Sequence, residues 1–417
     1  MRAFLQIVKL ELISAVRSKM MILFAVSSAA WMIFGRNFIK GDEADVYQLS
    51  VRYLLGTVFG VVLLSLGSAA AGVLSTDRAA KRLQLTMIRP VPYSVVAMAR
   101  SVALTVVGSA VLAFALILLW AFEGRGRMCD RIFSPVLEDP LKAAEAEFDE
   151  MYASNEELRR TVDEVGDKTP FIKYLESRKR NQYADIAPGA TASWEFKGVP
   201  ENADNVSARV RLLHHIGLPG AALGTFSFRG LSGEVDGNVK TRFSVPLDSG
   251  SGDVSGGNSL SFTNNSNTGL TLQPRNDLKL LVRADSFAFN AFRGWLVMTF
   301  VLMIVVSVGV FLGSCLGRGV AIFVAISLLI VMVISPSTVE DYPDPTRLNS
   351  VSRWSLRISE FCADITAPVA KFSPISSLAA DEYIKWTDIG KAAASGGFYL
   401  IVFSLFSGFV MPRKQDD

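Results

Sequence analysis

Few residues in this chain have the types and spacing that chemistry at a protein site requires. The two histidines are adjacent, at His214 and His215, and no cysteine or carboxylate cluster lies near them in the sequence. Zinc sites use ligands at short, fixed spacings, and neither histidine has a partner at such a spacing. We therefore expect no metal site and no catalytic role for this pair.

A phosphate-binding loop for ATP is also absent from the sequence. The nearest string, GEVDGNVK at 233–240, lacks the Gly-x-x-x-x-Gly-Lys-Ser/Thr spacing whose backbone amides surround phosphate. The carboxylates of 138–164 alternate with basic residues, which is typical of a solvated helix face. No serine lies in a Gly-x-Ser-x-Gly turn. The sequence predicts a chain that is not itself an enzyme and that binds no cofactor or metal.

Six stretches of the chain contain no Asp, Glu, Lys or Arg, so its 42 basic and 39 acidic residues are confined to the remainder. A helix needs about 20 apolar residues to cross the hydrocarbon core, because lipid offers no partner to an unpaired backbone amide. We predict a polytopic α-helical membrane protein with six transmembrane helices. This excludes a soluble enzyme, a disordered chain and a secreted disulfide scaffold. The net charge of +3 also argues against nucleic acid as a partner. The stretches are 20–35, 53–76, 101–122, 294–317, 319–339 and 392–412.

The distribution of Lys and Arg in the connections predicts the orientation. Basic residues gather on the cytoplasmic side of a membrane, and they are dense in 1–19, 77–100 and 413–417. The connections 36–53 and 340–391 have fewer basic residues and more acids. We therefore expect both termini in the cytoplasm of a bacterial cell, a multi-pass chain in the cytoplasmic (inner) membrane, and residues 123–293 outside it.

Residues 123–293 form a predicted extracytoplasmic domain between the third and fourth spans. Its part 135–182 is rich in Ala and charge and reads as helices with a break near 166–170. Its part 186–289 has short runs of alternating apolar and polar residues, which predict an antiparallel sandwich or jelly roll of about six to eight strands.

Two further regions complete the organisation. Residues 294–339 hold the fourth and fifth spans, and 392–417 the sixth span with a cytoplasmic tail. The outer connection 340–391 contains WSLRISEF and DITAPVAKF, whose near-helical apolar spacing fits amphipathic helices on the membrane surface. A loosely packed loop fits them equally well.

The three cysteines offer one further possibility. With the orientation above, Cys129 and Cys362 share the oxidising compartment, whereas Cys315 lies at the inner end of the fourth span. A Cys129–Cys362 disulfide would join the base of the domain to the last outer connection. Two separate thiols are the alternative, because cysteines on the same side need not meet.

The basic segment 77–100, between the second and third predicted spans, carries the most functional information. Its leucines precede a break at Pro90 and Pro92, so a short helix there would end at a rigid corner where the chain re-enters the membrane. Such a corner could transmit force from a soluble partner, although a surface loop with an interfacial helix explains the same residues. The N-terminal segment 1–19 is amphipathic and basic, as expected for a helix in the plane of the interface.

Together these segments resemble the membrane subunits of type 2 ABC transporters, the exporter-class permeases. In that family an elbow helix before the first span carries a Lys-x-Glu pattern and then Arg, which Lys9, Glu11 and Arg17 match here. The family's loop after the second span runs from an acid through leucines to Arg-Pro and a basic residue. Asp77, Leu83, Leu85, Arg89, Pro90 and Arg100 follow that order, although the family more often has Glu at the first position.

The resemblance implies a subunit that pairs with a second permease, itself or a homologue, and with separate ATPase subunits that bind ATP and Mg. The loop 77–100 would act as the coupling helix that docks on the ATPase. Its expected contact residues are Asp77, Arg78, Lys81, Arg82, Leu83, Leu85, Thr86, Arg89 and Pro90. A receptor or scaffold, whose outer domain binds a ligand or an envelope partner and whose spans only anchor it, is the alternative function. Six spans exceed what an anchor needs, which favours the transporter.

Overall fold

The computed structural model describes the chain in eleven ranges: 2–17, 20–36, 38–39, 43–79, 91–165, 168–201, 205–214, 221–238, 242–249, 257–334 and 374–413. The described chain divides into two compact units. The first is helical and comprises residues 2–129, 285–334 and 374–413. The second comprises the described part of 130–284 and contains helices and a β-sheet.

The helical unit is built mainly of long helices. In chain order its elements are α1 (Arg2–Arg17), α2 (Met20–Arg36), α3 (Glu43–Ser50), the π-helical turn η1 (Val51–Leu55), α4 (Gly56–Ala79), α6 (Tyr93–Leu119), the π-helical turn η2 (Trp120–Gly124), α11 (Phe287–Cys315), α12 (Arg318–Ile334), α14 (Pro374–Ala379) and α15 (Trp386–Arg413). The two π-helical turns continue their neighbouring α-helices without a break.

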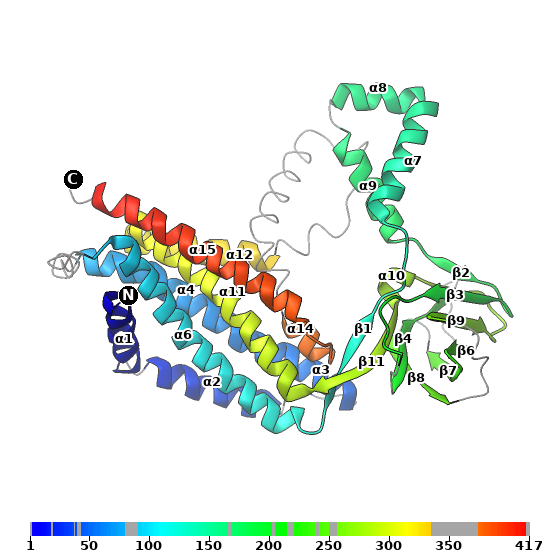
Figure 1. The fold of residues 1–417 in the computed structure, drawn as a ribbon, viewed down its shortest axis with the longest axis horizontal. Helices are drawn as coiled ribbons and strands as arrows, with labels where there is room; N and C mark the ends of the chain where they lie inside the picture. The colour runs from blue at the N-terminus through cyan, green and yellow to red at the C-terminus, as the bar shows by residue number, and fades with distance from the viewer. Residues whose placement is uncertain are drawn as a thin grey trace. The chain divides into compact units, whose positions relative to one another are not determined.

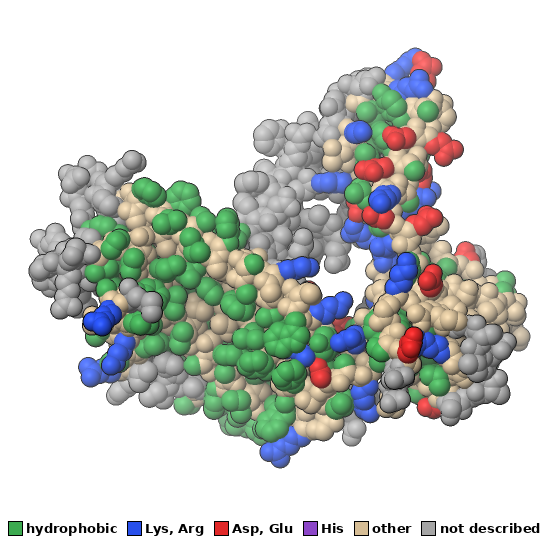
Figure 2. Space-filling view, viewed as in Figure 1, with side chains coloured by type: hydrophobic (Ala, Val, Ile, Leu, Met, Phe, Trp, Pro, Cys, Tyr) green, Lys and Arg blue, Asp and Glu red, His purple; other side chains and the backbone are tan. Residues whose placement is uncertain are grey.

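Four of these helices are long and apolar enough to cross a membrane: Tyr47–Thr76, Tyr93–Gly124, Phe287–Cys315 and Trp386–Val410. Their side chains give this unit a hydrophobic surface, whereas Lys, Arg, Asp and Glu are frequent on α7–α9 of the second unit (Figure 2). The prediction of apolar helices able to span a membrane is confirmed for these four helices. The two remaining predicted spans correspond to the shorter helices α2 and α12.

Each of the four long helices begins before the uncharged stretch that predicted it. The second predicted span starts at 53, whereas its helix passes through the η1 turn from Tyr47. The helix at Phe287 precedes the predicted start at 294, and Ser286 caps it by accepting a hydrogen bond from the backbone amide of Phe289 at 3.5 Å. The helices therefore include charged residues that a charge-free criterion assigns to the connections.

Helix α11 lies at the centre of the unit, packed against α4, α6 and α15 (Figure 1). Its contact with α4 is close because small residues face each other. An ideal Cβ at Gly313 would be 2.4 Å from the carbonyl oxygen of Ala71, and one at Gly309 would be 2.8 Å from that of Gly67. Small residues four positions apart let two membrane helices approach at backbone distance.

The second unit contains three helices whose own side chains form a small core. They are α7 (Pro140–Ser154), α8 (Glu156–Val165) and α9 (Thr169–Arg180). Asp139 caps α7 by accepting from the amide of Leu141 at 3.1 Å. Phe148 of α7 packs on Phe171 of α9, with ring centroids 6.4 Å apart.

The rest of this unit is β-structure in two sheets. The strands are β1 (Met128–Phe133), β2 (Ala184–Ile186), β3 (Thr191–Glu195), β4 (Val206–Arg211), β5 (Leu213–His214), β6 (Ala221–Phe228), β7 (Leu231–Asn238), β8 (Arg242–Ser249), β9 (Ser259–Asn264), β10 (Leu270–Leu272) and β11 (Leu278–Ser286), and the short helix α10 (Pro274–Asp277) precedes the last one. One sheet has the order β1-β11-β4-β8-β7-β6-β9-β3 and the other the order β2-β10-β5.

The large sheet consists of two four-stranded halves. They are joined where β7 pairs with β8 over only two residue pairs, Leu231 with Ser249 and Ser232 with Asp248. Buried side chains of both halves and of the small sheet belong to one hydrophobic core, with Phe226 and Phe262 in ring contact at 4.6 Å. The antiparallel pairing predicted for this region is confirmed in the registers of β4–β8, β6–β7 and β3–β9.

Six to eight strands were predicted for 186–289, and the described residues of that range contain nine, β3 to β11. Strand β7 was missed because its sequence, LSGEVDGN, looks like a turn. Its glycines are needed for close approach: a Cβ at Gly233 would be 2.4 Å from the carbonyl oxygen of Pro246. The string 233–240, which resembles a phosphate loop only loosely, begins inside this strand.

Candidate functional site

The most distinctive site in the helical unit lies where α1 meets the beginning of α6. Arg100 is two turns inside α6, although the sequence placed it before the third span, and it is only 8% exposed. Its Nε lies 3.0 Å from Oε1 of Glu11 on α1. A guanidinium is expensive to bury among apolar helices unless a carboxylate accompanies it. The ion pair therefore fixes the N-terminal helix to α6, whose first two turns form the end of segment 77–100.

A cavity of about 580 Å³ adjoins this ion pair. Two arginines and one glutamate are its charged residues, so its lining carries one excess positive charge. Arg318, at the start of α12, is exposed there. The lining comes from α1 (Leu10, Glu11, Ser14), α4 (Ser68, Ala69, Gly72, Val73, Thr76), α6 (Arg100) and α12 (Arg318, Ile322).

The cavity is therefore lined in part by the last turns of α4 and the first turns of α6, the two helices that segment 77–100 connects. Thr76 is in the final turns of α4, and α6 begins at Tyr93 directly after Pro92, whose carbonyl accepts from the amides of Val95 and Val96 at 3.0 and 3.3 Å. Helix α15 also reaches this end of the unit, where a Cβ at Gly408 would be 3.0 Å from the Cβ of Ser94. A displacement of segment 77–100 would act first on these helix ends.

The other residues predicted for this site have different outcomes. Lys9 and Arg17 are exposed on α1, beside the paired Glu11. Asp77 and Arg78 belong to the last turn of α4. The remaining predicted contact residues lie outside the described ranges, and they are Lys81, Arg82, Leu83, Leu85, Thr86, Arg89 and Pro90. Their role in docking an ATPase stays a prediction.

A second polar cluster lies at the opposite ends of the helices, which the sequence did not predict. The carboxylate of Asp381 accepts from the hydroxyl of Tyr47 at 2.8 Å and from Nη1 of Arg127 at 3.3 Å. The Arg127 guanidinium also lies over the Tyr47 ring, 3.7 Å from its centroid. The Tyr47 hydroxyl is 3.0 Å from the carbonyl oxygen of Leu378 on α14. These bonds join α3, the end of η2 and the chain before α15.

Arg293 on α11 extends this cluster and is 3% exposed. Its Nη2 lies 2.8 Å from Oδ2 of Asp285, and its guanidinium faces three aromatic rings at 4.2 to 5.3 Å from their centroids. Arginine stacked on aromatic faces gains cation–π attraction. The three rings belong to Phe289, Tyr383 and Trp386.

Asn290, three residues before Arg293 on α11, binds the backbone of the chain before α15. Its amide donates to the carbonyl oxygen of Glu382 at 2.8 Å, and its Oδ1 accepts from the amide of Ile384 at 2.8 Å. The end of the predicted outer connection 340–391 is therefore held against α11. Amphipathic helices expected at 354–361 and 364–372 lie outside the described residues.

Aromatic residues near the ends of the predicted spans are the sequence feature from which the Arg293 cluster could have been predicted. Phe289 and Trp386 lie just outside the uncharged stretches at 294 and 392, and aromatic side chains at span ends are frequent partners of arginine. Because the predicted spans had to be free of charge, Arg293 was assigned to the connection before the fourth span. Its contacts with Asp285 and Trp386 were therefore not predicted.

The remaining candidate residues are separate from these sites. His214 is in β5, paired with Leu270, and His215 lies outside the described ranges. Cys129 is buried in β1, whereas Cys362 is outside the described ranges, so the disulfide stays a prediction. Within the described ranges no group of three His, Cys, Asp or Glu side chains is placed to hold a metal ion.

Four helices long and apolar enough to cross a membrane, with a β-rich second unit, indicate an α-helical membrane protein. No protein-family model, no curated protein and no solved structure matches this chain at a significant level.

Proposed function

We propose that this chain is the membrane-spanning permease subunit of an ATP-driven ABC transporter that serves export or another process of the cell envelope. The ion pair between Glu11 and Arg100 is the observation that carries the proposal. It links the N-terminal helix to α6, whose first turns belong to segment 77–100, and both are parts that carry the family resemblance. A rigid link there would pass a displacement of the segment to several membrane helices at once.

In this proposal the energy comes from a separate subunit. The sequence has no phosphate loop, so ATP and Mg would be bound by partner ATPases beneath the membrane. Residues 77–100 would dock on that partner through their basic and leucine residues. A second permease copy, identical or homologous, would complete the transporter.

The proposal also includes a topology. Helices α2 and α12 would cross the bacterial inner membrane together with the four longer helices, giving six spans with both termini in the cytoplasm. Residues 123–293 would lie outside, where the sheet core could receive a substrate or an envelope partner. A lipid-like, polymeric or peptide cargo would suit spans with few charges better than a small ion.

Co-purification with an ATPase tests the proposal. The tagged chain would be isolated in mild detergent from the membranes of the organism that makes it, and its partners identified by mass spectrometry. We expect an ATPase with a phosphate loop in the complex. Combined charge reversal at Lys81, Arg82 and Arg89 should release that ATPase, because the docking surface would change sign.

A matched control separates docking from general charge effects. Lys142 is exposed on α7, in the second unit, and Lys142→Glu should leave the complex intact. An ATPase that stays bound with unchanged turnover after the triple reversal would disprove coupling through this loop. Isolation of the chain with an envelope protein or ligand and no ATPase would favour the receptor or scaffold.

A further inference from the structure

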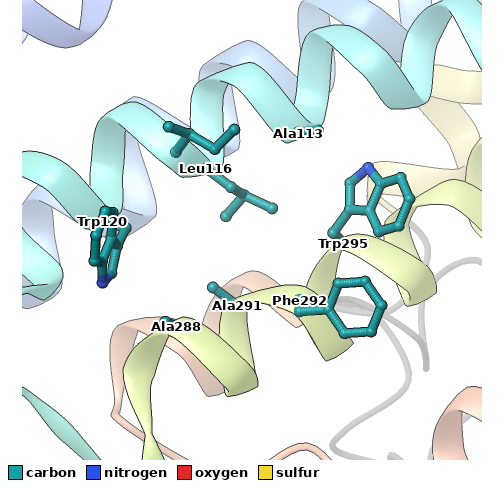
Figure 3. Close-up of a pocket in the computed structure, with 8 residues that line it drawn as sticks. Ala113, Leu116, Trp120, Ala288, Ala291, Phe292 and Trp295 are labelled. Carbon is teal, nitrogen blue, oxygen red and sulfur yellow. The ribbon is translucent and has the colours of Figure 1, made fainter.

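An apolar groove runs between α6 and α11. Its volume is about 370 Å³. Figure 3 shows Trp120 at one end of the groove and Phe292 and Trp295 at the other, with the short side chains of Ala288 and Ala291 between them. The residues that line it are Ala113, Leu116, Ile117, Trp120, Ala288, Ala291, Phe292 and Trp295.

The groove is open on the outer surface of two helices that are apolar enough to cross a membrane. Ile117 is 59% exposed and Phe292 46% exposed, so their side chains face outward from the helical unit. In a bilayer such a surface is in contact with lipid. A groove with an apolar lining then accommodates a hydrocarbon chain.

The walls of the groove are fixed by contacts between the helices. The indole N–H of Trp295 on α11 donates to the carbonyl oxygen of Ser109 on α6 at 2.8 Å. Trp295 also packs on Phe292, with ring centroids 5.6 Å apart. The Trp295 ring is held by a hydrogen bond and by an aromatic contact, so its surface is preformed. A preformed surface lowers the entropic cost of binding.

One end of the groove carries a positive charge. Arg125, the residue after η2, is exposed, and its guanidinium lies over the Trp120 ring, 5.8 Å from the centroid. The nearest acid along the chain, Glu123, has its Oε1 buried from solvent, which turns that oxygen away from the surface. Tryptophan prefers the depth of lipid headgroups, and a basic residue beside it suits a phosphate.

We propose that this groove binds an anionic phospholipid, with one acyl chain between α6 and α11 and the phosphate at Arg125. The apolar lining selects the chain, and the guanidinium, which can donate two parallel hydrogen bonds, selects the phosphate. The net negative charge of the headgroup distinguishes this lipid from a zwitterionic one. The proposal is independent of the assignment as a transporter.

Fluorescence quenching by brominated lipids tests it. The full chain would be reconstituted into phosphatidylcholine vesicles that contain increasing fractions of either acyl-brominated phosphatidylglycerol or acyl-brominated phosphatidylcholine. Bromine quenches tryptophan on contact, and the part of the quenching lost in Trp120→Phe reports the groove. We expect the anionic lipid to reach half-maximal quenching at a fraction about fivefold lower, because one basic residue near the surface contributes about that factor.

Two pairs of variants make the test specific. Arg125→Gln should abolish the preference for the anionic lipid, whereas Lys385→Gln, which removes an exposed charge before α15, should keep it. Ala288→Phe should fill the groove and reduce quenching by both lipids, whereas Ala394→Phe at an exposed position of α15 should not.

Three results would overturn the proposal. The first is equal quenching by the two lipids in the wild-type chain. The second is the same loss of preference in Lys385→Gln as in Arg125→Gln, which would indicate a general charge effect. The third is protection of Trp120 from both lipids together with cross-linking of two copies through Ala288→Cys, which would show that a second copy covers the groove.

Discussion

Arg100 and Arg293 show two ways in which this protein stabilises a buried guanidinium. Arg100 has a carboxylate from another helix at 3.0 Å. Arg293 has Asp285 at 2.8 Å and, in addition, aromatic faces on three sides. An ion pair among apolar helices is costly to break, so Arg100 fixes α1 to α6. Arg293 pairs with Asp285 at the end of β11 and contacts the start of α15 through the ring of Trp386.

At the same scale, Asp130 in β1 gives the second unit a predicted pH dependence. Burial raises the pKa of this carboxyl above 3.8, its ordinary value, while the positive charges of Arg209 and Arg283 oppose the shift. The folded state therefore holds the proton more tightly than the unfolded state. Its free energy of unfolding should fall as the pH rises from near 4 through the raised pKa, because ionised Asp130 is less favourable in the folded sheet.

Hydrogen exchange can measure this effect in the intact chain. The exchange of β1 and β11 amides, corrected for the intrinsic rate at each pH, should show less protection at pH 7.5 than at pH 4.5. Asp130→Asn should flatten the profile, since an amide cannot ionise, whereas Asp248→Asn in β8, at an exposed position, should leave it unchanged. Protection that rises with pH in the wild-type chain would contradict the assignment.

At the scale of elements, the contact between α4 and α11 depends on the absence of side chains. Gly309 and Gly313 are four residues apart on α11, and they meet Gly67, Ala70 and Ala71 on α4. In lipid there is little hydrophobic gain in joining two helices, so van der Waals contact at short distance must supply the attraction.

Gly313→Ala should therefore destabilise the helical unit, by about 1 to 3 kcal/mol as for other overpacked interiors. The added Cβ would be 2.4 Å from the Ala71 carbonyl oxygen, which is backbone and can move only if the helices separate. Thermal unfolding in detergent would measure the loss. Gly60→Ala is the control, because a Cβ there meets nothing within 4 Å. Equal melting temperatures for the two variants would show that the contact between α4 and α11 does not limit the stability of the helical unit.

The elements also show which parts of the fold the sequence could predict. Alternation predicted β4, β6 and β9 because each buries every second side chain. It failed for β7, whose glycines allow close approach to β8. The uncharged stretches predicted the apolar centres of the membrane helices but not their ends, which contain charged residues. The Glu11–Arg100 pair was not predicted, because the two residues belong to separate sequence motifs. The Arg293 cluster was not predicted either, because it joins residues that are far apart in the sequence.

At the scale of the whole molecule, the number of spans depends on α2 and α12. Each is described over 17 residues, which gives a length of about 25 Å. That is at the lower limit for crossing a hydrocarbon core of about 30 Å. A basic residue at the end, such as the exposed Arg318 of α12, would let such a helix span by extending its side chain to the headgroups. We therefore retain six spans as the predicted topology.

Labelling of single cysteines with a membrane-impermeant maleimide tests this topology. With Cys129, Cys315 and Cys362 changed to Ala, new cysteines would be introduced by Gln6→Cys, Lys142→Cys, Gly317→Cys and Lys385→Cys. Six spans place positions 142 and 385 outside, where they should react in intact cells, and positions 6 and 317 inside, where they should react only after the membrane is opened. If α12 did not cross, positions 317 and 385 would react alike. If α2 did not cross, positions 6 and 142 would react alike, because two crossings, α4 and α6, rather than three would then separate them.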